Sequence, residues 1–293
     1  MPSPAESFLT HKPRLFGLAY RMLGSRADAE DVLQDAYLRW QEARRDEIKS
    51  PEAWLVTVVT RLSIDRLRDA KKEREAYTGP WLPEPLVAEE PASSESPERA
   101  VELAGDVSMA FLMVLERLAP EERAVFLLRE VFDMDYPEVA RMLGKSEAAC
   151  RQLLHRAKER VREGKPRFQV NPAAHRRLLE RFVAATGSGK REDMLALFAK
   201  DVRFSGDGGG KVPSALRVLE GAERVVRFYT AIRRFASVRS FTYRHAEING
   251  EPGLLRFLDG ELDAAITLVT DGVHILEIYT VRNPDKLRRI HVS

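Results

Sequence analysis

Residues 135–163 read DYPEVARMLGKSEAACRQLLHRAKERVRE, and this stretch predicts two short helices joined by a tight turn. Between residues 136 and 143, apolar side chains recur at the helical spacing i, i+3, i+4 and i+7. Asp135 stands where an N-cap is preferred, and Gly144 stands where a left-handed residue commonly ends a helix. Ser146 is then placed to cap the second helix.

The second of these helices has a narrow apolar stripe at Ala149, Leu153, Ala157 and Val161, and a polar face rich in cations. A helix-turn-helix presents such a face to the major groove of DNA, where arginine can bind guanine, glutamine can bind adenine and other cations meet phosphates. The pattern favours DNA binding over the alternative, a helical hairpin with a solvated charged face. The polar face consists of Arg151, Gln152, His155, Arg156, Lys158, Arg160 and Arg162.

The composition of the chain indicates how many domains it forms and in which compartment it works. The chain has 293 residues, 44% of them hydrophobic, which is enough for two or three small domains with separate cores. Because the net charge is only +2, any nucleic-acid signal must come from local segregation of charge. The single cysteine excludes an internal disulfide framework and suits a reducing compartment. No apolar run approaches the roughly eighteen residues of a membrane span, so we expect a cytoplasmic protein that does not contact a membrane. The six histidines and one cysteine show no metal-ligand spacing, and we expect neither a metal nor a cofactor.

Two helices are predicted near the start of the chain. Residues 8–23 fit the first, Gly24 interrupts the pattern, and Ser25 begins a second helix whose buried face includes Val32 and Trp40. Another face of the second helix carries polar side chains at i, i+3 and i+4. The residues alone favour a solvated acidic stripe over a docking surface for a basic or polar partner. These side chains are Asp31, Gln34 and Asp35.

A third helix is predicted to begin at Ser50-Pro51, which follow the preferred N-cap and N1 order. Between residues 61 and 74 this helix becomes basic. Such a segment could hold phosphates and unpaired bases, or its cations could only complement the dipole of their own helix. The predicted core face consists of Trp54, Leu55, Val58, Val59 and Leu62.

Residues 77–105 change composition, because prolines recur, serines accumulate and acidic residues dominate. Proline-rich, acidic chain of this kind predicts a stiffened and partly disordered linker. Trp81 is unusual there, since a linker tryptophan commonly docks on a domain; a local contact with a neighbouring proline is the alternative.

The C-terminal part predicts a compact α+β domain. Helical patterns cover residues 173–186, 190–199 and 221–235, and a strand is predicted over 202–205. Alternating runs then follow, divided by strong hairpin signals. Helices followed by an antiparallel meander imply the α+β class. The hairpin signals are Asn249-Gly250, Asp259-Gly260 and Asp271-Gly272.

Taken in order, these segments resemble a bacterial sigma factor of the extracytoplasmic-function (ECF) group over residues 8–164. In that group, a promoter-melting region 2 domain and a helix-turn-helix region 4 domain are joined by a flexible linker. The resemblance implies a multidomain chain, with an all-α region 2 over residues 1–75, the linker over 76–105 and an all-α region 4 over 106–166.

The resemblance also implies partners and roles. Asp28 to Asp35 resembles the surface that binds the clamp of core RNA polymerase, which turns Asp31, Gln34 and Asp35 from a solvated stripe into expected polymerase contacts. Residues 61–68 resemble the segment that reads and opens the −10 promoter element, and residues 136–159 resemble the −35 reader. The expected −10 contacts are Trp54, Arg61, Asp65, Arg66, Arg68, Lys71 and Lys72, and the expected −35 contacts are Ser146, Arg151, Gln152, His155, Arg156 and Lys158.

Residues 172–293 resemble the SnoaL-like, or NTF2-like, cone, an α+β fold that one subgroup of ECF sigma factors carries fused to its sigma domains. In that subgroup the tail is thought to regulate the sigma domains in place of a separate anti-sigma protein. We therefore expect an intramolecular contact between the subgroup's motifs and the sigma domains or linker. The motif residues are Trp81 in WLPEP, then Asp207, Gly208, Gly209, Gly210 and Lys211, and finally Asn283, Pro284, Asp285, Lys286 and Leu287.

The main alternative is that the cone binds a small molecule or acts as an isomerase or cyclase. Such enzymes use an Asp/His pair in an apolar cavity, for which Asp201, His245 and His274 are the candidates, although their spacing defines no site. A phosphate-binding loop at the glycine run is excluded, because Val212 stands where Ser or Thr is needed. Cys150 is expected to be a small packed residue, with a redox switch as the less favoured alternative.

Overall fold

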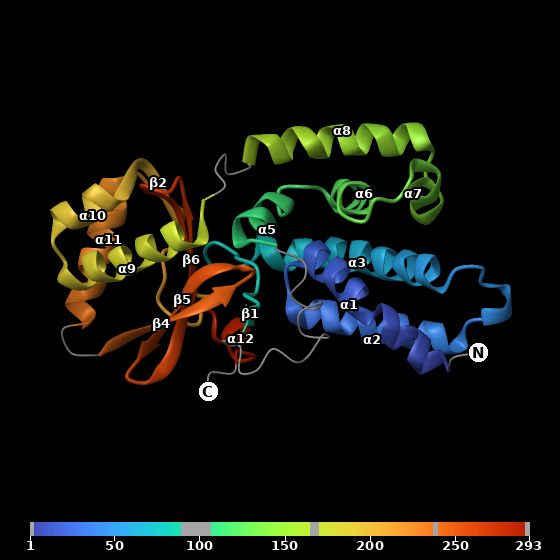
Figure 1. The fold of residues 1–293 in the computed structure, drawn as a ribbon, viewed down its shortest axis with the longest axis horizontal. Coiled ribbons are helices and arrows are strands. Elements are labelled where there is room, and N and C mark those ends of the chain that lie inside the picture. Colours follow the sequence, from blue (N-terminus) through green and yellow to red (C-terminus); the bar gives the residue numbers. More distant parts are fainter. Residues whose placement is uncertain (1–2, 89–106, 165–169, 237–239, 291–293) are drawn as a thin grey trace. The chain divides into compact units, whose positions relative to one another are not determined.

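The computed structural model describes residues 3–88, 107–164, 170–236 and 240–290, and the chain divides into two compact units (Figure 1). Within these ranges, no helix combines the length and the apolar character that crossing a membrane requires. Unit 1 is made of Met1–Glu75, Glu95–Val107 and Phe111–Lys165, and unit 2 of Ala76–Ser94, Ser108–Ala110 and Pro166–Ser293.

Unit 1 is built from helices whose ends follow the predicted caps. Gly24 ends the first helix with a left-handed φ of 66°. Ser25 then accepts a hydrogen bond from the backbone N–H of Asp28 at 3.2 Å and so begins the second. The helices are α1 (Pro4–Leu23), α2 (Arg26–Glu42), α3 (Pro51–Glu75), α5 (Met109–Leu115), α6 (Pro120–Glu130), α7 (Tyr136–Leu143) and α8 (Glu147–Gly164), with a short 3-10 turn, η1, at Arg45–Glu47.

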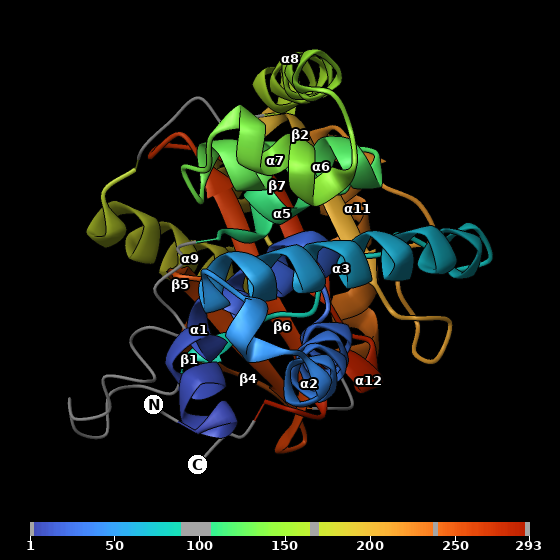
Figure 2. The same cartoon turned by 90° about the vertical axis from the view of Figure 1, so that its right-hand side faces the viewer.

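The helices of unit 1 lie in layers: α1 and α2, then α3, then α6 and α7, with α8 outermost (Figures 1 and 2). Leu15, Leu18 and Leu55 are completely buried between α1, α2 and α3. Trp40 closes the same core, and its indole N–H donates to the carbonyl oxygen of Pro4 at 3.0 Å. This core holds α2 and α3 in place and leaves their polar faces outward.

The predicted core face of α3 is only partly right. Leu55 and Val59 are buried, but Trp54, Val58 and Leu62 are half-buried. The helix contacts α1 and α2 and also α6 and α7, so its buried surface is turned and widened relative to a single amphipathic stripe. The side chains that share this buried surface are Leu55, Val56, Val59, Thr60, Ser63, Ile64, Leu67 and Ala70.

Unit 2 contains a seven-stranded sheet with the strand order β1-β4-β5-β6-β7-β2-β3. Strands β4 to β7 form the predicted antiparallel meander, and Asn249 and Asp259 take the positive φ angles of 54° and 53° that tight hairpins need. The strands are β1 (Val87–Ala88), β2 (Phe198–Asp207), β3 (Leu219–Glu220), β4 (Phe241–Ile248), β5 (Glu251–Leu258), β6 (Glu261–Thr270) and β7 (Ile275–Val281).

Strand β2 differs from the prediction in length and in pairing. Residues 198 and 199 were expected to end a helix, but they already belong to the strand, because Phe198 turns into the core. The strand runs parallel to β7, pairing Phe204 with Ile278 and Asp207 with Val281. A parallel partner far away in the sequence leaves no hairpin signal, so the sequence pattern could not reveal it.

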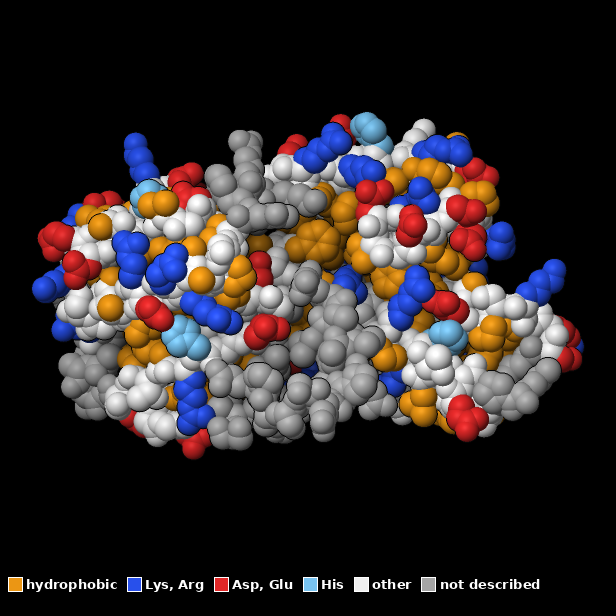
Figure 3. Space-filling model, in the orientation of Figure 1, with side chains coloured by type: hydrophobic (Ala, Val, Ile, Leu, Met, Phe, Trp, Pro, Cys, Tyr) orange, Lys and Arg blue, Asp and Glu red, His pale blue; other side chains and the backbone are white. Residues whose placement is uncertain are grey.

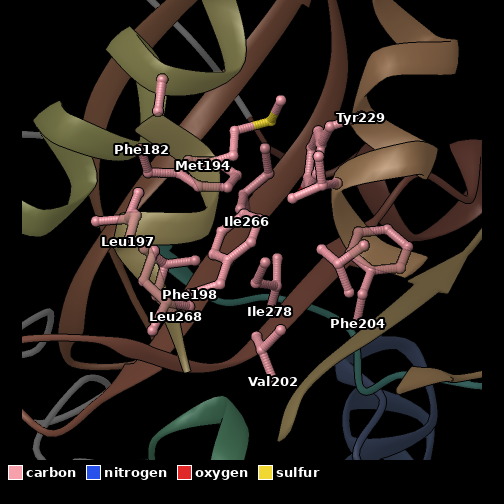
Figure 4. Packing of buried hydrophobic residues seen from close by; sticks show 14 of the residues in the cluster. Phe182, Met194, Leu197, Phe198, Val202, Phe204, Tyr229, Ile266, Leu268 and Ile278 are labelled. Carbon is pink, nitrogen blue, oxygen red and sulfur yellow. The ribbon is translucent and has the colours of Figure 1, made fainter. Parts of the chain in front are cut away.

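Helices α9 (Pro172–Ser188), α10 (Arg191–Leu197) and α11 (Ala222–Ala236) pack on the sheet and enclose the core of unit 2 (Figure 4). Phe182 packs edge-on against Tyr229, with 5.5 Å between the ring centroids. A short helix, α12 (Pro284–Leu287), follows β7. The packed core places the end of β2 and the start of α12 side by side, since the backbone N–H of Arg282 donates to the carbonyl oxygen of Asp207 at 2.7 Å.

The first part of the predicted linker belongs to unit 2. Strand β1 joins the sheet by pairing with β4, and Asn249 binds Leu86 through both its backbone and its side chain. Leu82 and Glu84 are buried. A flexible linker is therefore the wrong description for residues 77–88; residues 89–106 lie outside the described part of the chain.

Candidate nucleic-acid interface and linker contact

The predicted helix-turn-helix is present as α7 and α8. Asp135 accepts from the backbone N–H of Glu138 at 2.8 Å, Gly144 has a φ of 63°, and Ser146 accepts from the backbone N–H of Ala149 at 3.2 Å. The buried stripe of α8 is wider than predicted, and Ala149 is only half-buried. The fully buried side chains are Cys150, Leu153, Leu154, Ala157 and Val161.

Cys150 is part of this packing. Its side chain is completely buried, and burial raises the pKa of its thiol above the ordinary value. Because the thiolate is the reactive form, these two features disfavour a redox switch.

The outer face of α8 carries basic side chains and a histidine (Figure 3). Most of the predicted −35 residues there, including Arg151, Gln152 and His155, are exposed. Arg151 binds Glu147 of its own helix at 2.8 Å, and the Nδ1 atom of His155 lies 3.5 Å from Glu159. These pairs join neighbouring exposed side chains along one helix, so they can exchange for contacts to an outside partner.

Two further basic side chains of α8 are paired with acidic residues of α6. Arg156 places its Nε atom 3.1 Å from an oxygen of Glu122, and Lys158 places its Nζ atom 2.8 Å from Glu130. Glu122 is buried, whereas Glu130 is exposed. Sequence reasoning did not single out Glu122, because only the packing of α6 against α8 brings it to Arg156.

The basic half of α3 is exposed, but several of its side chains already have partners. The guanidinium of Arg61 donates to the carbonyl oxygen of Met142 at 2.8 Å, and that of Arg68 donates to Glu121 at 2.9 Å. Arg66 binds Asp28 through two nitrogens, at 2.9 and 2.6 Å. Six of the predicted −10 residues are exposed: Arg61, Asp65, Arg66, Arg68, Lys71 and Lys72. The seventh, Trp54, is half-buried beside Trp40, with 5.4 Å between the ring centroids.

The polar face of α2 is accessible in unit 1. Asp31, Gln34 and Asp35 are all exposed, and within the described chain none of them makes an ion pair or a hydrogen bond through its side chain. Leu38 continues the same helical face and is 50% exposed, so an apolar side chain stands beside the three polar ones. The i, i+3, i+4, i+7 spacing that marks Asp31, Gln34 and Asp35 could have identified Leu38, but the sequence reasoning passed over it.

In unit 2, Asp207 is the centre of a contact between linker and cone. Its carboxylate is completely buried and accepts hydrogen bonds from the hydroxyl of Tyr77 at 2.6 Å, the backbone N–H of Leu82 at 2.9 Å and the ammonium of Lys286 at 2.7 Å. A fourth bond comes from the backbone N–H of Gly209 at 3.0 Å. Asp207 thus joins two linker residues to α12.

Asn283 and Lys286 complete this contact. The amide of Asn283 donates to the hydroxyl of Tyr77 at 2.8 Å, while its oxygen caps α12. The ammonium of Lys286 donates to the carbonyl oxygen of Leu82 at 2.5 Å and lies 4.1 Å from the ring centroid of Trp81. Burial, followed by the bond to Asp207, raises the pKa of the Tyr77 hydroxyl, so Tyr77 stays a neutral donor.

The comparisons with known proteins agree with these two units. Family models match residues 8–73 as Sigma-70 region 2, residues 108–161 as Sigma-70 region 4 and residues 179–289 as a SnoaL-like domain. The ECF RNA polymerase sigma factor SigJ of Mycobacterium tuberculosis is 40% identical over 94% of this chain and 90% of its own. The chain belongs to the ECF sigma factor family.

A second relative and the crystal structure of SigJ support the same conclusion. The probable ECF sigma factor SigI of Mycobacterium tuberculosis is 31% identical over 94% of this chain and 92% of its own. The crystal structure of SigJ matches 97% of this chain and 98% of its own, with a TM-score of 0.76 and 35% identity. A member of this family directs promoter-specific initiation of transcription, and here region 2 corresponds to α1–α3 and region 4 to α5–α8.

The glycine run of this sigma factor is a loop of very close approach. An added Cβ at Gly208 would lie 2.3 Å from the carbonyl oxygen of Val212, and one at Gly209 would lie 2.4 Å from the side chain of Asn283. Gly209 also has a left-handed φ of 61°. Glycine at these positions lets the loop reach the Asn283 side chain without a clash.

The candidate catalytic residues of the cone do not form a buried pair. Asp201, His245 and His274 are all exposed, and the core of the cone is lined by apolar side chains. Among the described residues, no cluster of His, Cys, Asp or Glu could hold a metal ion. The cone does contain a buried ionic cluster, in which Asp263 binds Arg256 at 2.5 Å and Arg282 at 2.5 Å. Burial alone would raise the pKa of the Asp263 carboxyl, but the two guanidiniums outweigh burial and lower that pKa.

Proposed function

We propose that this sigma factor binds core RNA polymerase through α2, reads a two-part promoter through α3 and α8, and has its activity tuned by its own SnoaL-like cone. The proposal keeps the domain boundaries 1–75, 76–105, 106–166 and 172–293. It places the protein in the cytoplasm with the polymerase and gives it no catalytic role. The observation that carries the regulatory part is the Asp207 contact, which fixes linker residues on the cone.

The polymerase surface is supported by the exposure of Asp31, Gln34 and Asp35, which unit 1 does not use for its own packing. Reversing the charge of Asp31 or Asp35 should abolish capture of core polymerase in a pull-down while circular dichroism stays unchanged. Glu180→Lys is the matched control, because Glu180 is an exposed carboxylate of the cone. Undiminished capture by the Asp31→Lys and Asp35→Lys variants would remove this surface from the proposal.

Promoter reading is supported by two groups of exposed basic side chains, one on the second half of α3 and one on α8. Arg and Gln on a recognition helix can discriminate base edges, while the lysines contribute through phosphates. Arg61, Arg66 and Arg68 first have to give up their protein partners, so their pairing with Met142, Asp28 and Glu121 competes with DNA. Each of these pairs has exposed members, which keeps the competition small.

Regulation by the cone follows from where the linker is held. Residues 77–88 are the start of the covalent connection between α3 and α5, and they are fixed on the cone by the Asp207 contact and by β1. A change in this attachment changes how much chain is left to connect the two promoter-reading regions. A coupling of about 1–3 kcal/mol is typical for such linked equilibria and would shift activity several-fold.

Run-off transcription with core polymerase tests the regulatory part. Tyr77→Phe removes the hydroxyl that bridges Asp207 and Asn283, and the full-length variant should change promoter activity several-fold. Tyr243→Phe is the matched control, because Tyr243 packs against the core of the cone and not against the linker. Equal activity of the Tyr77→Phe variant and the unmodified chain would leave the cone as a passenger, for which ligand binding or catalysis would then be the competing function.

A further inference from the structure

Glu122 is a buried carboxylate that stands outside the helix-turn-helix and yet touches its recognition helix. It lies in the first turn of α6, and the residue is 4% exposed. The residue at the N-cap is Ala119, which has no side-chain oxygen, so Glu122 accepts the backbone N–H of Ala119 at 3.1 Å instead. This hydrogen bond within α6 orients the Glu122 carboxylate independently of its contacts with α8.

Two arginines of α8 converge on this carboxylate. The Nε atom of Arg156 lies 3.1 Å from the Oε1 atom of Glu122, and a terminal nitrogen of Arg160 donates to the Oε2 atom. The side chains of Arg156 and Arg160 remain 56% and 45% exposed, so Glu122 holds both guanidiniums without covering them. Two cations on one carboxylate leave an excess positive charge on the DNA-facing surface.

The atom that Arg156 uses matters for recognition. The Nε atom is the part of the guanidinium that forms the ion pair with Glu122, and the described chain offers the two terminal Nη groups no partner. A pair of Nη groups matches the two acceptors, O6 and N7, on the major-groove edge of guanine. Holding the side chain beforehand lowers the entropy lost on binding.

Arg151 provides the contrast within the same helix. It pairs with Glu147 one turn away, and both side chains are about half exposed, at 55% and 43%. Both residues belong to α8, so this pair does not tie the guanidinium to the rest of the domain. The Arg151 guanidinium also lies 4.9 Å from the ring centroid of Tyr136 in α7. Arg151 therefore rests on an exposed carboxylate and an aromatic ring, whereas Arg156 pairs with a buried carboxylate in the first turn of α6.

We infer that Glu122 is a positioning residue for promoter recognition: it presents Arg156 to one base position, so that the preference at that position depends on a carboxylate that contacts no DNA. This inference rests on the proposed role of Arg156 in reading the −35 element. It adds that the precision of the reading comes from α6, and that Arg160 is held beside Arg156 by the same group.

The test is run-off transcription by the full-length chain with core RNA polymerase from a promoter library randomised across the −35 region. Glu122→Gln keeps the shape and the oxygen that caps α6 but removes the negative charge. It should lower the preference for guanine at one position by about tenfold while thermal unfolding changes little. Arg156→Ala should flatten the same position, and the double variant should show no further loss there.

Glu130→Gln is the matched control, because Glu130 lies on α6 and holds Lys158 of α8 at 2.8 Å. It should leave base preferences unchanged. Should Glu122→Gln fail to fold, Glu122→Asp replaces it, since aspartate keeps the charge but is one methylene shorter and withdraws the carboxylate from Arg156; it should lower the same preference.

The outcomes separate the inference from the function on which it rests. If Arg156→Ala flattens one position and Glu122→Gln leaves it intact, Glu122 is not a positioning residue although Arg156 reads a base. An equal loss on every sequence for Arg156→Ala means that Arg156 contacts only phosphate, which overturns both. A loss of preference that is additive in the double variant also overturns the inference, because the two residues then act independently.

Discussion

Glu122 in unit 1 and Asp207 in unit 2 are both buried carboxylates surrounded by donors. The donors around Glu122 are partly exposed to solvent, whereas those around Asp207 belong to an enclosed contact. Glu122 binds the arginines of a recognition helix, and their side chains remain about half exposed. The donors of Asp207 are Tyr77, Leu82, Gly209 and Lys286, which belong to the linker and cone of the same unit, and the residue is completely enclosed.

This difference explains why one carboxylate suits recognition and the other suits attachment. The cations on Glu122 outnumber it and can still meet phosphates and bases, so part of their hydrogen-bonding capacity is directed outward. Lys286 balances the charge of Asp207, and its side chain is only 11% exposed, so nothing is left over for an outside partner.

Asp207→Ala should have the largest effect, because it leaves the ammonium of Lys286 buried without its carboxylate and leaves Tyr77 and Leu82 without their acceptor. Breaking a buried pair in this way costs about 3–5 kcal/mol. Hydrogen exchange at the Leu82 amide of the full-length chain is the local measurement, and its protection should fall accordingly. Asp285→Ala is the control, since Asp285 is exposed and pairs with Lys211 at the surface. Equal protection in the two variants would mean that Asp207 does not hold the linker.

Arg156→Ala should have the next largest effect, on DNA affinity. Losing a bidentate base contact costs about 1–3 kcal/mol for the preferred sequence and much less for others. Lys158→Ala, in contrast, should weaken binding by similar amounts on all sequences, because a lysine paired with the exposed Glu130 is suited to phosphate. Fluorescence anisotropy of holoenzyme on duplexes selected from a randomised library measures both. Sequence-independent loss for both variants would erase the distinction between the two side chains.

The features that could be predicted from sequence are those whose cause is local. The caps Asp135, Gly144 and Ser146, and the hairpins at Asn249 and Asp259, lie where the residue types require them, because each depends on backbone geometry within a few residues. The amphipathic spacing likewise located the helices and placed most of the predicted contact residues on the surface.

The features that were missed depend on residues far apart in the sequence. Tyr77 meets Asp207 across 130 positions, and β2 lies parallel to β7 with no connecting hairpin. Glu122 looks like an ordinary first-turn acidic residue until α8 is packed on α6. The prediction of a flexible linker over residues 77–88 failed for the same reason. The prolines and acidic residues indicate only the local properties of this segment, whereas the groups that hold it in place lie on the cone.

The third prediction concerns a buried group without a counter-charge. His175 of α9 is 7% exposed; burial lowers the pKa of its imidazole, and a hydrogen bond with the backbone of Leu268 offsets this only in part. The folded state therefore binds fewer protons than the unfolded state below about pH 6.5, so unit 2 should lose stability as the pH falls through that range. One proton sets an upper limit of about 1.4 kcal/mol per pH unit.

Urea unfolding of the full-length chain at pH 7.5 and pH 5.5 measures this effect, with His175→Gln as the comparison, because glutamine stays neutral at both values. The difference in stability between the two pH values should be smaller in the variant. An identical difference in both proteins would show that other groups cause the pH dependence.

The smallest effect on stability is expected for Lys211→Ala. Lys211 belongs to the same loop as Asp207, but its pair with Asp285 is exposed on both sides, at 53% and 54%. Exposed pairs of this kind contribute at most about 1 kcal/mol, so thermal unfolding of the full-length chain should barely change. This separation between Asp207 and Lys211 is what makes the variant informative, because a change in run-off transcription at unchanged stability would come from the surface of the loop and not from a loosened linker. A large drop in unfolding temperature would instead show that the surface pair and the buried contact form one cooperative structure. The stability of the Asp207 contact would then depend on the exposed Lys211–Asp285 pair as well as on its buried donors.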